Sequence, residues 1–89
     1  MKVKELLALL ANEDPEAAVV VSGFETVATN YVAEVNLIAT CVTVGTKPDA
    51  MSGDRRIEVG GQPTIWLGWK EDYRTQSLLE AIADPTHFD

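Results

Sequence analysis

The sequence contains few residues of the types that carry out catalysis. His87 is the only histidine and Cys41 is the only cysteine. A catalytic triad would need His87 as its base, and a metal site would need it beside Asp84 and Asp89, but a chain terminus does not hold such a side chain in place. Cys41 could act as a nucleophile, although its apolar neighbours favour a buried, inert thiol. We therefore predict a non-enzymatic protein with no catalytic residue, no metal site and no cofactor.

An acidic cluster surrounds Pro15 at the predicted end of a helix. It consists of Glu13, Asp14 and Glu16. Anions are unfavourable at this end of a helix dipole, so the placement does not favour stability. The cluster can be a solvated turn, or it can be a docking patch for a basic surface, to which Glu25 would contribute.

The segment "TIWLGWKEDY" combines aromatic and acidic side chains. In an extended chain Trp66 and Trp69 lie on opposite faces, so one should be covered and the other open. Either the C-terminal helix covers Trp66, or Trp66 is available to a partner. Tryptophan and tyrosine are enriched among the residues that dominate protein interfaces. The predicted partner-binding residues here are Trp66, Trp69, Glu71, Asp72 and Tyr73.

Two adjacent cations, Arg55 and Arg56, follow a turn-rich stretch. They could bind a phosphate or a carboxylate, or they could pair with nearby aspartates. The surrounding glycines lack the spacing of a phosphate-binding loop. A pocket for an anionic ligand, with residues 24–30 and 45–56 as its loops, is therefore an alternative.

Apolar spacing predicts the elements that must position these side chains. Residues 3–12 have the spacing of an amphipathic helix, which the Asp-Pro pair at 14–15 should end near residue 12 or 13. Residues 17–21 do not alternate, which is typical of a strand buried on both faces. Residues 31–45 alternate with an apolar odd face, as in a half-buried strand, and their length requires a bulge or bend.

The second half of the chain predicts a loop, two strands and a helix. Residues 45–56 are rich in turn-forming types. Residues 56–59 and 63–69 are strand candidates joined by the turn "GGQ". A short helix follows over 77–83, capped by Thr75 or Ser77 and ended by Asp84-Pro85.

This order predicts an α+β fold, a mostly antiparallel four-stranded sheet with an N-terminal helix and a short C-terminal helix packed on it. Residues 1–84 would form one domain and residues 85–89 a tail. The leucines of the first helix and residues 17–21 would share one core.

The charge limits the class of partner. Fourteen acidic and seven basic residues give the 89-residue chain a net charge of −7. This disfavours direct binding to nucleic acid or anionic membranes and favours a basic partner, although the charge can also serve only solubility. A single cysteine fits a reducing cytoplasm, and the opening residues lack the apolar region of a signal peptide. No stretch is long enough to span a membrane.

The opening "MKVKELLALLANEDPEAAVVVSGFE" resembles that of small uncharacterised proteins of bacteriophages and prophages. Those proteins start with a "VKELLxLLxxxDPEAxVVV"-type helix-Asp-Pro-strand segment and continue with a Gly-aromatic-acid segment, here Gly23, Phe24 and Glu25. The resemblance covers about the first quarter of the chain and implies a small cytoplasmic α+β protein without implying an activity. It also implies a context in which compact acidic proteins often inhibit host machinery, including host defence.

Together these features predict a small acidic protein-binding protein, encoded by a phage or prophage, that docks on a basic surface of a host protein. Inhibition of host defence is the specific version of this prediction. Two alternatives stay open. One is a self-associating structural or assembly protein, and the other is a protein that sequesters a small anionic ligand.

Overall fold

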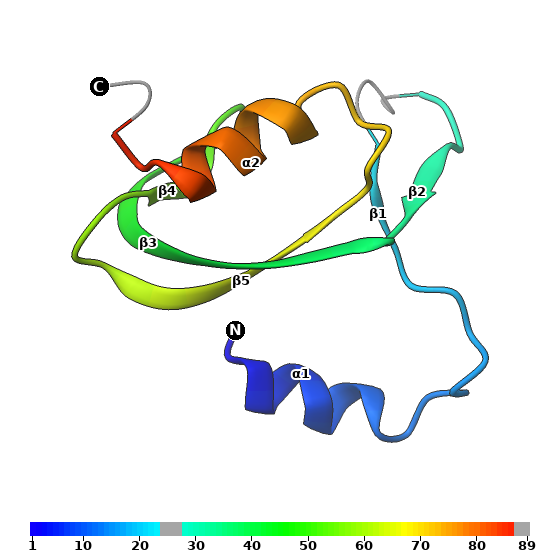
Figure 1. Cartoon of the computed structure of the whole chain (residues 1–89). Helices are drawn as coiled ribbons and strands as arrows, with labels where there is room; N and C mark the ends of the chain where they lie inside the picture. The colour runs from blue at the N-terminus through cyan, green and yellow to red at the C-terminus, as the bar shows by residue number, and fades with distance from the viewer. Residues whose placement is uncertain (24–27, 87–89) are drawn as a thin grey trace. The chain divides into compact units, whose positions relative to one another are not determined.

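The computed structural model describes residues 1–23 and 28–86 and comprises two compact units, Met1–Glu34 and Val35–Asp89 (Figure 1). The α+β class is confirmed. The single four-stranded sheet is wrong, because the described strands form one two-stranded and one three-stranded antiparallel sheet. The elements are α1 (Val3–Leu10), β1 (Val20–Ser22), β2 (Val32–Glu34), β3 (Leu37–Asp49), β4 (Gly53–Ile57), β5 (Gln62–Gly68) and α2 (Thr75–Ala83).

In the first unit, α1 ends two to three residues earlier than the Asp-Pro pair predicts. The backbone N–H of Ala11 donates to the carbonyl of Leu7 at 3.0 Å and completes the last turn. Most of the apolar stripe is exposed, with Leu7 at 64% and Leu10 at 45%, and only Leu6 is half-buried. The common core predicted for this stripe and residues 17–21 is therefore not formed.

The same unit contains the short β1–β2 ribbon, in which Val21 lies opposite Ala33. Of the predicted strand at 17–21, only Val20 and Val21 are in β1, and Val20 is 48% exposed. The prediction of a strand buried on both faces is wrong. A ribbon of two three-residue strands is too small to bury both of its faces, and each of its strands is an edge strand.

In the second unit, β3 is the central strand and the order is β4-β3-β5. Residues 37–43 of β3 pair with β5, and the other end pairs with β4, so Thr43 lies opposite both Gln62 and Ile57. Figure 1 shows β3 curving from one neighbour to the other. The predicted hairpin between residues 56–59 and 63–69 is wrong, because β3 lies between these strands and offers an edge to each.

The predicted alternation of residues 31–45 is confirmed. Cys41 and Thr43 are buried on the inner face of the three-stranded sheet, whereas Ile38 on its outer face is 67% exposed. The predicted bend is present too, because the extended segment is interrupted between β2 and β3 and the β3–β4 register shifts between Gly45 and Asp49.

The loop predicted over residues 45–56 is instead a hairpin, since β3 continues to Asp49 and β4 begins at Gly53. The carboxylate Oδ1 of Asp49 accepts hydrogen bonds from the backbone N–H groups of Met51 at 2.8 Å and Ser52 at 3.1 Å. Turn-forming residue types therefore occupy a tight turn and the strand ends beside it.

The helix α2 packs against β3, with Leu78, Leu79 and Ile82 half-buried. Arg74 occupies its N-cap position, so neither Thr75 nor Ser77 is the cap, and the helix ends before Asp84 as predicted. Among the described residues, no helix combines the length and apolar character that a membrane span needs.

Candidate functional site

A hydrogen-bonded turn, residues 69–75, connects β5 to α2 and is called here the Trp69 turn. The carbonyl of Trp69 accepts hydrogen bonds from the backbone N–H of Asp72 at 3.2 Å and from the hydroxyl of Thr75 at 2.7 Å. The N–H of Thr75 donates to the carbonyl of Asp72 at 2.9 Å. Thr75 is only 5% exposed, so these bonds hold the turn from its buried side.

Asn36, at the start of the second unit, joins the Trp69 turn to the sheet. Its side-chain Oδ1 accepts a hydrogen bond from the backbone N–H of Lys70 at 2.9 Å, and its own N–H donates to the carbonyl of Gly68 at 3.1 Å. Its Nδ2 lies 3.5 Å from a carboxylate oxygen of Glu71. One side chain therefore contacts both the backbone and an acidic side chain of the turn.

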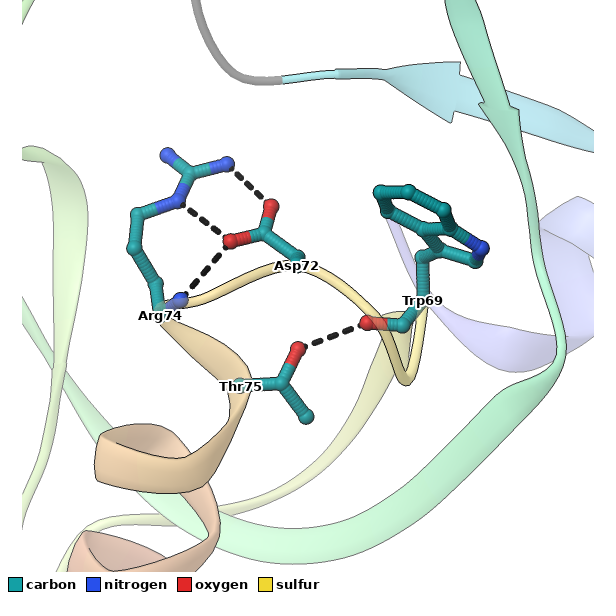
Figure 2. Close-up of polar contacts among 4 residues, drawn as sticks. All are labelled: Trp69, Asp72, Arg74 and Thr75. Atoms are coloured by element: carbon teal, nitrogen blue, oxygen red, sulfur yellow. Dashed lines mark hydrogen bonds and ion pairs between the residues drawn. The ribbon is translucent and has the colours of Figure 1, made fainter.

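The two tryptophans lie in different environments. Trp66 is half-buried on the inner face, opposite Ala39, whereas Trp69 is 36% exposed. Tyr73 is 71% exposed. In Figure 2 the indole of Trp69 stands away from the hydrogen-bonded backbone of the turn. The sequence predicted that one tryptophan is covered and the other is open. The more covered one is Trp66, and the more open one is Trp69.

Asp72 forms a two-pronged ion pair with Arg74, as Figure 2 shows. Arg74 Nη2 lies 2.6 Å from Asp72 Oδ2 and Nε lies 3.0 Å from Oδ1, which also accepts the backbone N–H of Arg74 at 2.9 Å. The side-chain hydrogen bonds from Arg74 lower the pKa of Asp72 below its ordinary value, and the carboxylate raises the pKa of Arg74 in turn. The carboxylate of Asp72 is therefore hydrogen-bonded within the turn. The exposed acidic residue of the Trp69 turn is Glu71.

The acidic cluster Glu13, Asp14 and Glu16 lies in the first unit, and all three residues are exposed. The carboxylate of Asp14 accepts the backbone N–H of Glu16 at 2.9 Å, so it also shapes the turn. The fourth predicted member, Glu25, lies outside the described residues.

Arg55 and Arg56 line a cavity of about 270 Å³ between β4 and α2. Residues 45–56, predicted as one loop of an anion pocket, instead form the β3–β4 hairpin, and most of the other predicted loop, residues 24–30, lies outside the described residues. The opposite wall of the cavity comes from α2, which the sequence did not associate with the arginines.

Of the residues considered for catalysis, the structure describes Cys41 and Asp84. Cys41 is 8% exposed, and this burial raises the pKa of its thiol, as expected for an inert cysteine. His87 and Asp89 lie outside the described residues. Within residues 1–23 and 28–86, no three histidine, cysteine, aspartate or glutamate side chains gather in a way that could hold a metal ion.

Sequence reasoning missed Asn36, Arg74 and Thr75, which hold the Trp69 turn in place. The spacing Asp-x-Arg was available as a signal for the ion pair, but a charged pair two residues apart has no regular geometry outside a turn. The polar Asn36 interrupts an otherwise strand-like run, which was a signal for a break but not for its partner.

The chain matches no protein-family model, no curated protein and no solved structure. Evidence for a function therefore comes from the geometry of the chain itself, above all from the Trp69 turn.

Proposed function

We propose that this protein is a protein-binding module and that the Trp69 turn is its principal contact surface. The observation that carries the proposal is that Trp69 and Tyr73 are exposed on a turn whose backbone is held by hydrogen bonds from Asp72 and Thr75. Exposed aromatic side chains of this kind contribute most of the binding energy in many interfaces.

The internal hydrogen bonds of the turn favour binding because they leave fewer backbone and side-chain groups to become ordered when a partner binds. Association loses free energy when loops and side chains become immobile, and a preformed turn has already lost much of that freedom. Trp and Tyr add large contact areas with few rotatable bonds. Asn36 restricts the turn further by accepting the N–H of Lys70.

The partner in this proposal is a protein with a basic surface. The chain carries a net charge of −7, and Glu71 is an exposed acid that lies between the two aromatic residues of the turn in the sequence. Opposite charge would steer the encounter and set its salt dependence. The more specific version, a phage-encoded inhibitor of host defence, remains part of the proposal, with the acidic cluster at Glu13, Asp14 and Glu16 as a second contact.

The test is a pull-down from bacterial lysate with the tagged protein and three variants. Trp69→Ala combined with Tyr73→Ala should lose a stoichiometric partner that the unchanged protein retains. Tyr31→Ala removes a tyrosine that is 80% exposed in the other unit, and it should keep the partner. Rising salt should release the partner, because the encounter is charge-guided.

A partner retained by the double variant would exclude the Trp69 turn as the contact. Replacing Glu13, Asp14 and Glu16 with lysine tests the second contact in the same way. If binding survives that triple change, the acidic cluster has no part in recognition.

Self-association is a second candidate because the outer face of the three-stranded sheet is apolar and open. Ile38, Val42 and Ile65 on this face are 67%, 38% and 43% exposed. A second copy would present the same apolar side chains of β3 and β5, which carry no charge. Light scattering over a concentration series should show a dimer that Ile38→Lys dissociates. A monomer at every concentration would exclude this candidate.

A further inference from the structure

We propose that the cavity between β4 and α2 binds a small organic anion with a short apolar tail. The cavity has a volume of about 270 Å³ and is lined by Arg55, Arg56, Ile57, Ser77, Leu78, Ala81 and Pro85. The two arginines come from the strand, and the apolar lining comes from the strand, the helix and Pro85 just beyond the helix. This combination suits a ligand that is charged at one end only.

Arg55 is held in place by neutral groups. Its Nε donates to the hydroxyl of Thr43 at 2.7 Å, and its Nη2 donates to the carbonyl of Thr43 at 3.2 Å and to Gln62 Oε1 at 3.4 Å. A guanidinium has five N–H donors. The two on Nη1 have no acceptor among the residues that the structure describes, and no described carboxylate pairs with Arg55.

A fixed guanidinium with donors to spare is suited to a carboxylate or phosphate, because both accept charge-assisted hydrogen bonds. Thr43 is 6% exposed, so the group that positions Arg55 is itself part of the sheet interior. The excess of negative charge elsewhere on the chain makes this local positive charge unusual and limits the anion to a small one.

The apolar wall determines the size and polarity of the uncharged part of the ligand. Leu78, Ala81, Pro85 and Ile57 line the cavity and offer an alkyl chain contact area without polar groups. A cavity of 270 Å³ holds about eight to ten non-hydrogen atoms, since each water-sized unit of liquid takes about 30 Å³. Hexanoate and butyl phosphate have this size and charge.

The experiment is a titration of the full chain, followed through backbone amide signals in NMR, with hexanoate, butyl phosphate and neutral hexanamide as probes. We expect hexanoate or butyl phosphate to shift the signals of Arg55, Ile57, Leu78 and Ala81, with a Kd of about 1 mM for a ligand this small. The headgroup that binds more tightly identifies the anion. Hexanamide should bind at least about tenfold more weakly, because it lacks the charge that strengthens these hydrogen bonds.

Three variants separate the cavity from nonspecific effects. Arg55→Gln removes the charge and should weaken hexanoate binding about tenfold, whereas Lys47→Gln removes an exposed cation that does not line the cavity and should leave it unchanged. Ala81→Leu fills the cavity and should abolish binding, while the amide spectrum remains that of a folded protein. Equal binding of hexanamide and hexanoate would overturn the proposal. So would the absence of shifts at concentrations about tenfold above the expected Kd.

Discussion

The indole ring of Trp66 lies directly over Gly68, two residues further along β5. A Cβ atom at position 68 would come within 2.7 Å of Cζ2 and 2.8 Å of Cη2 of the ring. Both residues belong to the inner face, where they lie opposite Ala39 and Leu37. The absence of a side chain at Gly68 therefore lets Trp66 fold down onto its own strand just before the chain enters the Trp69 turn.

Gly68→Ala should therefore destabilise the protein. The added methyl group would overlap the ring of Trp66 and force it or the strand to move, which costs about 1–3 kcal/mol. Urea unfolding measures the change in the free energy of unfolding. Gly45→Ala is the matched control, since a Cβ there would meet only Arg55 Nη1 at 3.9 Å, an ordinary contact distance. Equal stability of the two variants would show that the ring is not held over Gly68.

Thr75→Val should loosen the Trp69 turn. The substitution keeps the shape of the side chain but removes the hydroxyl that donates to the carbonyl of Trp69, at a cost of about 1–2 kcal/mol for a buried bond. Hydrogen exchange of the amide of Asp72, which donates to the same carbonyl, should also become faster. Thr40→Val, on the exposed outer face of β3, is the control. Unchanged exchange at Asp72 in Thr75→Val would mean that the hydroxyl does not hold the turn.

Local patterns predicted the elements of the fold better than their pairing. The alternation around Cys41 predicted its burial, because side-chain direction in a strand follows the sequence at a period of two. Which strands become neighbours depends on contacts distant in sequence. Thr43 meets both Gln62 and Ile57, and nothing in the spacing of these residues indicates that one strand separates the other two.

The residue types of the candidate site were predictable from the sequence, but the contacts that hold them in place were not. The aromatic and acidic residues of the Trp69 turn are visible in the sequence, whereas the bond from Lys70 to Asn36 joins residues far apart in the chain. The arginine cavity likewise needs α2 as its second wall. Such partnerships arise from tertiary structure, which a single sequence does not encode in any local pattern.

Asp72→Asn should remove a pH-dependent part of the stability. The bond to Arg74 lowers the pKa of Asp72 in the folded state, so the stabilisation is complete above the ordinary aspartate pKa of about 3.9 and is lost as the pH falls through the lower folded value. The variant should be less stable at pH 7 by about 0.5–1 kcal/mol, because the pair is near the surface.

Thermal unfolding of both proteins between neutral pH and about pH 2 checks this prediction, since the difference between them should shrink below about pH 4. Asp54→Asn changes an exposed aspartate and serves as the control. A difference that stays constant down to the lowest pH would show that the charge of Asp72 does not contribute to stability.

Cys41 should react slowly with a thiol reagent in the folded protein. Its side chain lies on the inner face at 8% exposure, and burial raises the pKa of the thiol, so less of the reactive thiolate is present at pH 8. Modification then requires opening of the sheet, and an opening free energy of even about 1.4 kcal/mol slows it tenfold. Absorbance of the released chromophore from a disulfide reagent gives the rate in buffer and in denaturant.

The matched control moves the thiol by one residue. In the variant Thr40→Cys combined with Cys41→Ala, the cysteine lies on the exposed outer face of the same strand, so it should react about as fast folded as unfolded. Fast reaction of Cys41 in buffer would mean that the inner face opens readily and that α2 does not protect it. Slow reaction at both positions would mean instead that the outer face is covered in solution, as the self-association candidate requires.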